Sequence, residues 1–291
     1  MKWFAAVEEV RRFSRAARQA GRRIGLVPTM GYLHDGHLAL VRALKAEADV
    51  VILSIFVNPL QFAPHEDFER YPRDMERDRR LAEAAGVDAV FAPDVAEMYP
   101  VAAETYVEIP TLSARLDGES RPTHFRGVTT VVTKLFLAIE PDVAAFGQKD
   151  AQQAVIIKRM VRELLFPVRI VVVPTVREPD GLALSSRNVY LGPEERRAAP
   201  ALWRALQTGE ARIRRGERDP AAVEAAMAGV MAAEPLVRPE YARVLNLDEL
   251  VSVPTVAGRL LLAVAARVGP ARLIDNLCLE VEGDTVRPTL P

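Results

Sequence analysis

Short apolar runs, separated by amphipathic stretches, dominate the first 174 residues of the chain. The run from Val50 to Val57 is almost wholly apolar, as expected for a strand that is buried on both faces of a parallel sheet. Similar runs recur along the chain and predict five strands, over residues 24–27, 50–57, 87–91, 143–146 and 168–173.

Helical periodicity fills the intervals between these runs. In the first interval Val7, Val10, Phe13 and Ala17 recur at spacings of three and four residues, and Gly21 follows as a stop signal. Comparable patterns predict helices over residues 5–20, 37–48, 74–85, 128–138 and 151–163. Alternating strands and helices of this length predict an α/β fold, a Rossmann-like doubly wound parallel sheet.

The pattern changes after Pro174. Here two long helices are predicted over residues 193–214 and 220–233, followed by strand-like stretches at residues 241–245, 259–268 and 273–279. A chain of 291 residues is long for one compact core. We therefore expect a Rossmann-like domain over residues 1–175 and a smaller α+β domain over residues 176–291.

Charge and cysteine content narrow the possible partners. The chain has 38 Lys and Arg against 39 Asp and Glu, so it lacks the excess of positive charge that is typical of a general nucleic-acid binder or a polybasic membrane anchor. The apolar runs are far shorter than the roughly 18 residues of a membrane span, and no signal-peptide pattern precedes them. Cys278 is the single cysteine, a core thiol by default, which is typical of a reducing compartment. We expect a cytoplasmic protein with no nucleic-acid and no membrane partner.

The most informative segment lies between the first predicted strand and the next helix and reads Pro28-Thr29-Met30-Gly31-Tyr32-Leu33-His34-Asp35-Gly36-His37. A turn in this place lies at the carboxyl end of a strand, where ligands bind in doubly wound sheets. Gly31 and Gly36 allow close backbone approach, and the helix N-terminus offers N–H groups to a phosphate. His34 and His37 are three residues apart, so both imidazoles can face one ligand and donate to phosphate oxygens or a departing pyrophosphate.

Two other interpretations of the histidine pair stay open at this point. Two surface histidines in an ordinary turn would have no ligand. A metal pair would need a third ligand nearby in the fold, and the sequence shows none convincingly.

A second candidate is the segment Leu184-Ser185-Ser186-Arg187. Two hydroxyls and a guanidinium on a short loop can hold phosphate oxygens, with the arginine as a bidentate clamp. A pair of serines that caps a helix is the alternative.

A third candidate, Gly147-Gln148-Lys149-Asp150, directly follows a predicted strand and precedes a helix. Gly147 allows a nucleotide close to the backbone, and Lys149 can reach a phosphate. Asp150 either caps the following helix or holds a ribose hydroxyl. Gln152 and Gln153 begin that helix, and a glutamine there can donate to a small carboxylate or hydroxyl.

A fourth candidate, Asn58-Pro59-Leu60-Gln61-Phe62, follows the second predicted strand. Gln61 can bind a polar substrate group beside the wall formed by Phe62, although a turn with an incidental glutamine has the same pattern. The basic loop at residues 121–127 is either a solvated charge cluster or a cover over a phosphate site.

These segments together carry a resemblance. Residues 34–37 resemble the H-x-G-H signature of the nucleotidylyltransferase superfamily, and residues 184–187 resemble its second loop, which is similar to Lys-Met-Ser-Lys-Ser. More narrowly, the chain resembles the pantothenate synthetase family, in order along residues 24–192, through the segments 28–37, 58–62, 124–128, 147–150 and 176–187.

This resemblance implies an ATP-dependent, AMP-forming ligase that condenses pantoate with β-alanine. Pantoate would attack the α-phosphate of ATP to give pantoyl adenylate and pyrophosphate, and the amine of β-alanine would then displace AMP. The first domain would bind nucleotide and pantoate, and the second would cover the active site. The resemblance also implies a homodimer and a magnesium ion held largely by ATP oxygens and water, with Asp78 as a weak candidate for a metal contact.

The resemblance further implies roles for individual residues. The catalytic set is His34, His37, Lys149 and Arg187. The ATP-binding set is Pro28, Thr29, Met30, Gly31, Tyr32, Leu33, His34, Asp35, Gly36, His37, Gly147, Gln148, Lys149, Asp150, Val176, Leu184, Ser185, Ser186 and Arg187. The set that binds pantoate and β-alanine is Asn58, Gln61, Phe62, Val131, Val132 and Gln153.

Some positions depart from the family pattern. Gln148 stands where Glu is common, Ala151 where an aromatic is usual, Leu184 where Met is common and Thr123 where Gly often occurs. These flanking positions affect fine positioning rather than the reaction.

Two rival functions remain. An adenylyl- or cytidylyltransferase of the same superfamily shares the histidine pair, but Gln61 and Gln153 suit a neutral hydroxyl and a carboxylate better than a phosphorylated acceptor. A silent nucleotide-binding regulator would not require all four residues of the catalytic set.

Overall fold

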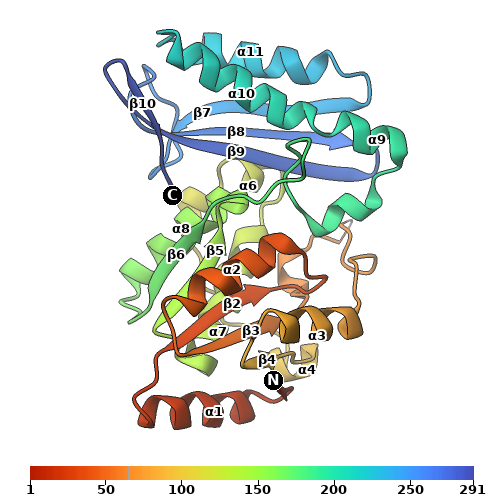
Figure 1. Ribbon diagram of the computed structural model, residues 1–291, viewed down its shortest axis with the longest axis vertical. Coiled ribbons are helices and arrows are strands. Elements are labelled where there is room, and N and C mark those ends of the chain that lie inside the picture. The colour runs from red at the N-terminus through yellow and green to blue at the C-terminus, as the bar shows by residue number, and fades with distance from the viewer. Residues whose placement is uncertain (65) are drawn as a thin grey trace. The chain divides into compact units, whose positions relative to one another are not determined.

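The computed structural model describes residues 1–64 and 66–291, which form two compact units (Figure 1). The first unit comprises Met1–Gly147 and Ile156–Val173, and the second comprises Gln148–Val155 and Pro174–Pro291. Each unit has its own hydrophobic core.

A six-stranded parallel sheet forms the centre of the first unit. Its strands, in the order in which they lie side by side, are β1 (Lys2–Phe4), β4 (Ala89–Phe91), β3 (Val50–Ile55), β2 (Ile24–Thr29), β5 (Val143–Gly147) and β6 (Arg169–Val173). The apolar runs form the central strands because helices cover both faces of the sheet, and along β3 every position is buried.

Helices pack on both faces of this sheet. The longer ones are α1 (Val7–Gln19), α2 (Asp35–Lys45), α3 (Met75–Ala84), α7 (His124–Ile139) and α8 (Ala151–Glu163), of which α8 begins in the second unit. Because successive strand residues point to opposite faces, Val27 and Leu53 pack with α2 and α3, whereas Leu26 and Ile52 pack with α1, α7 and α8. The predicted Rossmann-like doubly wound sheet is confirmed.

The strand order places a topological switch between β2 and β5. From β2 the chain proceeds through β3 and β4 towards one edge, and β5 and β6 then extend the sheet on the other side of β2. Ligands of doubly wound sheets bind outside the carboxyl ends of the strands at such a point. The segments that begin at Met30 and Gly147 leave the sheet at these two carboxyl ends.

The second unit contains a four-stranded antiparallel sheet with the order β10 (Thr285–Pro288), β9 (Ala271–Glu282), β8 (Gly258–Val268) and β7 (Val237–Asn246). The helices α10 (Ala201–Arg214) and α11 (Pro220–Ala232) pack together over one face of this sheet (Figure 1). Alternate residues of β8, among them Leu260, Leu262 and Val264, join their core. Because this unit combines an antiparallel sheet with helices, the predicted α+β class of the smaller domain is confirmed.

Several predicted boundaries are corrected. The helix predicted over residues 193–214 is two helices, α9 (Pro193–Ala198) and α10, because Pro200 lacks the N–H that a continuous helix needs and stands at the N-cap of α10. The sequence analysis missed the strands β1 and β10, and it also missed the short helices η1 (Pro59–Gln61), α4 (Val95–Met98), α5 (Pro110–Ser113), α6 (Asp117–Ser120), η2 (Gln148–Asp150) and η3 (Ser186–Tyr190). These elements are too short for a periodic pattern.

Candidate active site

The two histidines lie side by side at the start of α2. His34 is the N-cap residue, and its Nδ1 accepts a hydrogen bond from Gly36 N–H at 3.2 Å. His34 N–H in turn donates to His37 Nδ1 at 3.3 Å, and the two ring centroids are 4.0 Å apart. Because each Nδ1 accepts, a neutral ring carries its proton on Nε2, which is the nitrogen able to donate to a ligand. The spacing of three residues thus brings both imidazoles together, as predicted.

The loop before these histidines is held by the first turn of α3. Asp78 is 1% exposed, and its two carboxylate oxygens accept hydrogen bonds from Tyr32 N–H and Leu33 N–H, each at 2.7 Å. Arg77 donates to Leu33 O at 2.7 Å and stacks on the ring of Tyr32. Gly31 has φ +81°, and a Cβ there would lie 2.9 Å from Asp78 Oδ2. The loop geometry therefore depends on a glycine and on a buried carboxylate.

Asp78 also bears on the predicted metal contact. Burial raises the pKa of Asp78, while the N–H donors of Leu33 and Tyr32 and the charge of Arg77 oppose that shift. Both oxygens already serve the loop, so Asp78 has only its remaining lone pairs for an outer contact. Across residues 1–64 and 66–291, no cluster of three or more His, Cys, Asp or Glu side chains could hold a metal ion.

Other predicted residues of the segment Pro28 to His37 hydrogen-bond to the backbone or pack in the core. Thr29 Oγ1 donates to Ser54 O at 2.7 Å and accepts from Gly31 N–H at 3.1 Å. The side chain of Leu33 is fully buried in the core, so only its backbone is available to a ligand. Asp35 is exposed at the first position of α2.

A network of hydrogen bonds orients the amide of Gln61. Asn58 is buried, and its Nδ2 donates to Gln61 Oε1 at 3.2 Å and to Gly127 O at 3.0 Å. The hydroxyl of Tyr99 donates to Asn58 Oδ1 at 2.9 Å. Gln61 Nε2 lies 3.0 Å from Met30 Sδ, which joins Gln61 to the loop after β2. The structure thus brings together Met30, Asn58 and Gln61, all of which the sequence analysis singled out.

The basic loop at residues 121–127 supports the backbone of Gln61. Arg121 forms a two-point ion pair with Glu66, at 2.5 and 2.8 Å, and donates to Gln61 O at 3.3 Å. Burial alone would raise the pKa of Glu66, but Arg121 holds it below its usual range. His124 Nδ1 donates to the same carbonyl oxygen at 2.9 Å, and burial lowers the pKa of His124 to about 4. Of the two alternatives for this loop, the solvated cluster is therefore wrong, because Arg121 and His124 are largely buried.

Three predicted substrate residues are packing residues. Phe62 makes edge contacts with Phe68 and Tyr71, at centroid distances of 5.4 and 5.9 Å. Val131 and Val132 lie on α7 within the core of the first unit and are 7% and 3% exposed.

Of the remaining predicted residues, Gly147 ends β5 in the first unit and the others lie in the second unit. Gln148, Lys149 and Asp150 form η2 directly before α8, and Lys149 Nζ lies 3.4 Å from Asp150 Oδ1. The side chain of Gln148 is buried and donates to Asn276 Oδ1 of β9 at 3.4 Å. Gln153 is half-buried in the first turn of α8.

Residues 176–184 form a short hairpin that leads to the serines. Glu178 N–H donates to Leu182 O at 2.8 Å, and Leu184 N–H donates to Val176 O at 3.0 Å. Ser185 follows as the N-cap of η3, and its Oγ accepts from Arg187 N–H at 3.3 Å. Ser185 therefore has the capping role that the sequence left open, and Ser186 is buried.

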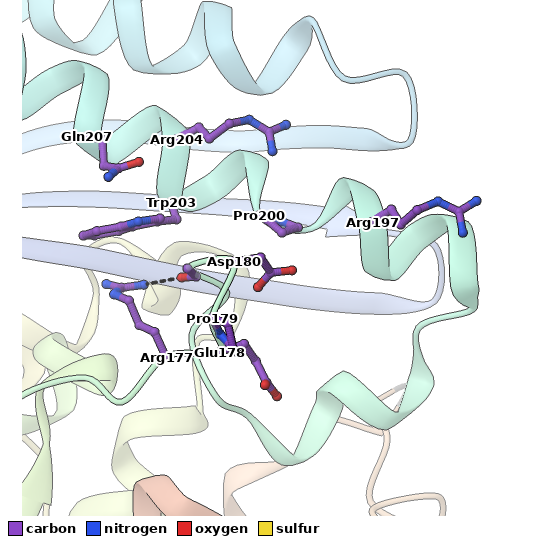
Figure 2. Close-up of a pocket in the computed structure, with 10 residues that line it drawn as sticks. Arg177, Glu178, Pro179, Asp180, Arg197, Pro200, Trp203, Arg204 and Gln207 are labelled. Carbon is purple, nitrogen blue, oxygen red and sulfur yellow. Dashed lines mark hydrogen bonds between the residues drawn. The ribbon is translucent and has the colours of Figure 1, made fainter.

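A pocket of about 670 Å³ lies beside this hairpin (Figure 2). It is lined by the turn Arg177, Glu178, Pro179, Asp180 and Gly181 and by residues 197–207 of the helical segment. Its three arginines already lie within ion-pair distance of carboxylates, which are Asp275, Glu194 and Glu234. Each of these arginines therefore has a carboxylate partner, and the pocket does not offer an anion an unpaired positive charge.

The sequence analysis missed the residues that hold these loops. Arg77, Tyr99, Asp275 and Asn276 were not singled out, and Arg177 stood within a quoted segment without a role, although each donates to or accepts from a predicted segment. An Asp-Asn pair inside a predicted strand is an unusual polar interruption, and that is the one signal that pointed to β9.

The predicted core position of the thiol is consistent with the structure. Cys278 is buried on β9, and burial raises its pKa to about 12. A protonated, enclosed thiol is a poor nucleophile, so covalent thiol chemistry is not indicated.

Comparison with known proteins settles the family. The sequence model of the pantoate-beta-alanine ligase family matches residues 2–278. The chain belongs to the pantoate-beta-alanine ligase family. The predicted resemblance is thereby confirmed, and with it the predicted class of enzyme, an ATP-dependent ligase rather than a nucleotidyltransferase.

Relatives within this family are similar over almost their whole length. The pantothenate synthetase of Moorella thermoacetica is 59% identical over 97% of this chain and 99% of its own. The crystal structure of pantothenate synthetase from Thermus thermophilus covers 95% of this chain and 99% of its own at 48% identity, with a TM-score of 0.90. That of the Francisella tularensis pantoate-beta-alanine ligase, complexed with beta-gamma ATP and beta-alanine, covers 95% and 97% at 31% identity, with a TM-score of 0.79.

Among the residues that the structure describes, none of the helices combines the length and the apolar character required to span a membrane.

Proposed function

We propose that this chain joins the carboxylate of pantoate to the amine of β-alanine, with cleavage of ATP to AMP and pyrophosphate. The observation that carries the proposal is the histidine pair at the N-terminus of α2, beside the topological switch of a sheet that belongs to this ligase family. The F. tularensis relative, which was crystallised with an ATP species and beta-alanine, supports these two substrates for this chain.

The first proposed step activates the carboxylate. A carboxylate oxygen of pantoate attacks the α-phosphorus of ATP, the bond to the β-phosphate oxygen breaks, and pyrophosphate leaves. Negative charge grows on the leaving pyrophosphate, so donors that are already in place stabilise the transition state. We assign this task to Nε2–H of His34 and His37, whose Nδ1 atoms are held by the backbone.

The second proposed step forms the amide. The amine of β-alanine attacks the acyl carbon of pantoyl adenylate, the acyl–oxygen bond breaks, and AMP leaves with that oxygen. The amine loses a proton to solvent or to the departing phosphate.

Pantoate recognition is assigned to Gln61 and Gln153. The amide of Gln61 is oriented by Asn58, which is in turn oriented by Tyr99, so its donor and acceptor are fixed before substrate arrives. The remaining proposed substrate residues, Phe62, Val131 and Val132, act by packing rather than by hydrogen bonds.

Nucleotide recognition is assigned to the segment Pro28–His37, to Gly147–Asp150 and to residues 176 and 184–187. Lys149 is assigned to stabilise the charge on the α-phosphate; its ammonium lies 3.4 Å from Asp150 Oδ1, the next residue of the same turn. Arg187, Ser185 and Ser186 hold the triphosphate, and Val176 contacts the adenine.

Magnesium fits this scheme as a partner of ATP. It would neutralise charge on the triphosphate, and phosphate oxygens and water would supply most of its ligands, with Asp78 at most an outer contact. The division into domains at residue 175, the cover over the active site, the homodimer and the cytoplasmic location stay predictions.

Exchange of labelled pyrophosphate into ATP tests the proposal. With pantoate and magnesium present and β-alanine absent, exchange should occur and should depend on pantoate. Folded protein that binds ATP and shows no such exchange would refute the adenylate step.

A further inference from the structure

Strand β9 carries two adjacent buried polar residues, Asp275 and Asn276, each 4% exposed. A buried polar group is costly unless it is hydrogen-bonded, so the partners of such a residue indicate its task. Successive residues of a strand point to opposite faces, and these two side chains accordingly reach different segments. Both η2 and η3 contact β9.

Asn276 fixes the backbone of η2. Its Nδ2 donates both hydrogens, to Gln148 O and to Lys149 O, each at 2.9 Å. Its Oδ1 accepts from Gln148 Nε2 at 3.4 Å. The orientation of the amide is set by these partners, because an oxygen in place of Nδ2 would face two carbonyl oxygens. The turn that presents Lys149 is therefore tied to a strand 127 residues further along the chain.

Asp275 fixes the hairpin at residues 176–184. Its carboxylate receives two hydrogen bonds from the Arg177 guanidinium, at 2.5 and 3.0 Å. Arg177 also donates to Gly181 O at 3.1 Å and lies 3.8 Å from the ring centroid of Trp203 (Figure 2). Gly181 has φ +93°, and a Cβ there would lie 2.0 Å from Trp203. The turn is therefore held between β9 and α10 by one arginine.

The place of these two residues in the sheet makes them a rigid support. β9 lies between β8 and β10, and Asp275 and Asn276 are in register with Val264 and Ala263 of β8. The backbone that carries the two side chains is thus hydrogen-bonded within the sheet, whereas η2 and the hairpin are short and irregular segments.

We infer that the Asp275–Asn276 pair is a shared positioning element for the two ATP-contacting segments of the second unit. Asn276 sets the turn that bears Lys149, and Asp275, through Arg177, sets the hairpin that ends at Ser185. The ATP-binding roles in this inference rest on the proposed function. The two anchors, which are the contacts of Asn276 with η2 and of Asp275 with Arg177, are observed in the structure. Neither residue touches substrate; both act through the segments they hold.

Hydrogen exchange of the whole protein tests the anchors without any use of activity. Asn276→Asp keeps the shape of the side chain but removes both donors, so exchange should accelerate at least tenfold in peptides that cover residues 148–151 and stay unchanged in residues 176–184. Asp275→Asn should give the opposite pattern. Equal acceleration across the unit in both variants, or no change in either segment, would overturn the inference.

Steady-state kinetics test the consequence for ATP. Asn276→Asp should raise the KM for ATP at least tenfold while the KM values for pantoate and β-alanine stay within twofold. A mere loss of folded enzyme would lower kcat and leave every KM unchanged, and this outcome would contradict the positioning role. Should the buried carboxylate that Asn276→Asp adds, or the guanidinium of Arg177 that Asp275→Asn leaves without its carboxylate, prevent folding, Asn276→Ala and Arg177→Ala remove the same contacts without adding a charge.

Asn246→Asp is the matched control. It makes the same substitution in the same sheet, on the edge strand β7, where the retained Oδ1 still accepts from Asp248 N–H and Glu249 N–H. It should leave exchange and all KM values unchanged. If the wild-type enzyme itself showed no pantoate-dependent use of ATP, the proposed function would fail, and the exchange patterns would still decide the anchors.

Discussion

The loop after β2 and the segments around η2 and η3 are held in different ways. The loop is held by residues that lie within about 45 positions of it. His34 and His37 form a capping box at the start of α2, and Asp78 of α3 accepts hydrogen bonds from the loop's N–H groups. The other segments depend on Asp275 and Asn276, which lie about a hundred residues away. The histidine motif could be found in the sequence, whereas the residues of other elements that hold either region were not recognised as supports.

Removal of His37, the proposed donor to the leaving pyrophosphate, should give the largest effect and tests the loop after β2. His37→Ala should lower the single-turnover rate of adenylate formation about 10²–10³-fold, with little change in ATP affinity, because the donor matters most when charge has developed. Rapid-quench measurement of pantoyl adenylate checks this. Arg42→Ala, on an exposed turn of the same helix, is the control, and an unchanged rate in His37→Ala would remove the assigned role.

The buried histidine at the start of α7, which donates to Gln61 O, gives a pH-dependent effect on stability. The folded-state pKa of His124 is about 4, against an ordinary 6.5, so the unfolded chain binds the proton first as pH falls. This contribution to stability is complete above about pH 6.5 and is lost as pH falls to about 4, with a total of about 3 kcal/mol.

Urea unfolding of wild type and His124→Gln between pH 7 and pH 4 measures this contribution. The variant should lose less stability over that interval, and its deficit relative to wild type should shrink as the pH falls. A difference between the two proteins that is independent of pH would contradict the account of His124.

The support of the loop after β2 should give a smaller loss. Asp78→Asn places an amide nitrogen against one of the two backbone N–H groups, so that buried donor loses its acceptor. The free energy of unfolding should therefore fall by about 2 kcal/mol. Chemical denaturation measures the loss. Asp74→Asn is the matched control on the same helix, since Asn caps a helix as well as Asp; equal losses in both variants would refute the role of Asp78.

The smallest predicted effect concerns substrate recognition in the second region. Gln153→Ala should weaken pantoate binding about tenfold, the value of one good hydrogen bond, and leave ATP binding nearly intact. Calorimetric titration with each ligand checks this, with the exposed Gln19→Ala as control. Equal loss for both ligands would indicate a structural defect instead of lost recognition.

Much of the fold follows from periodicity. The buried strands β2, β3 and β5 are predicted by apolar runs, and their flanking helices by spacing, because one continuous core imposes both patterns. Periodicity fails where an element is too short, as in β1, or where one proline divides a helical pattern, as between α9 and α10. The register of β9 against β8 cannot be predicted from the pattern of any single strand.

The candidate site was predictable in part for the same reason. His34 and His37 could be predicted because their chemistry and their geometry are both encoded within four residues. Gln61 and Asn58 were singled out, but Tyr99, which orients Asn58, could not be distinguished from an ordinary aromatic residue. Contacts between residues far apart in sequence, such as Asn276 with Lys149, appear only when the chain is folded.

The central claim is that the carboxylate of pantoate becomes the acyl part of an adenylate. Pantoate labelled with ¹⁸O in its carboxylate, turned over with ATP and β-alanine, tests it directly by mass spectrometry of the products. The account predicts one ¹⁸O atom in AMP for each amide formed, because AMP leaves with the oxygen that attacked phosphorus. Label in pyrophosphate or inorganic phosphate, or AMP free of label, would contradict it.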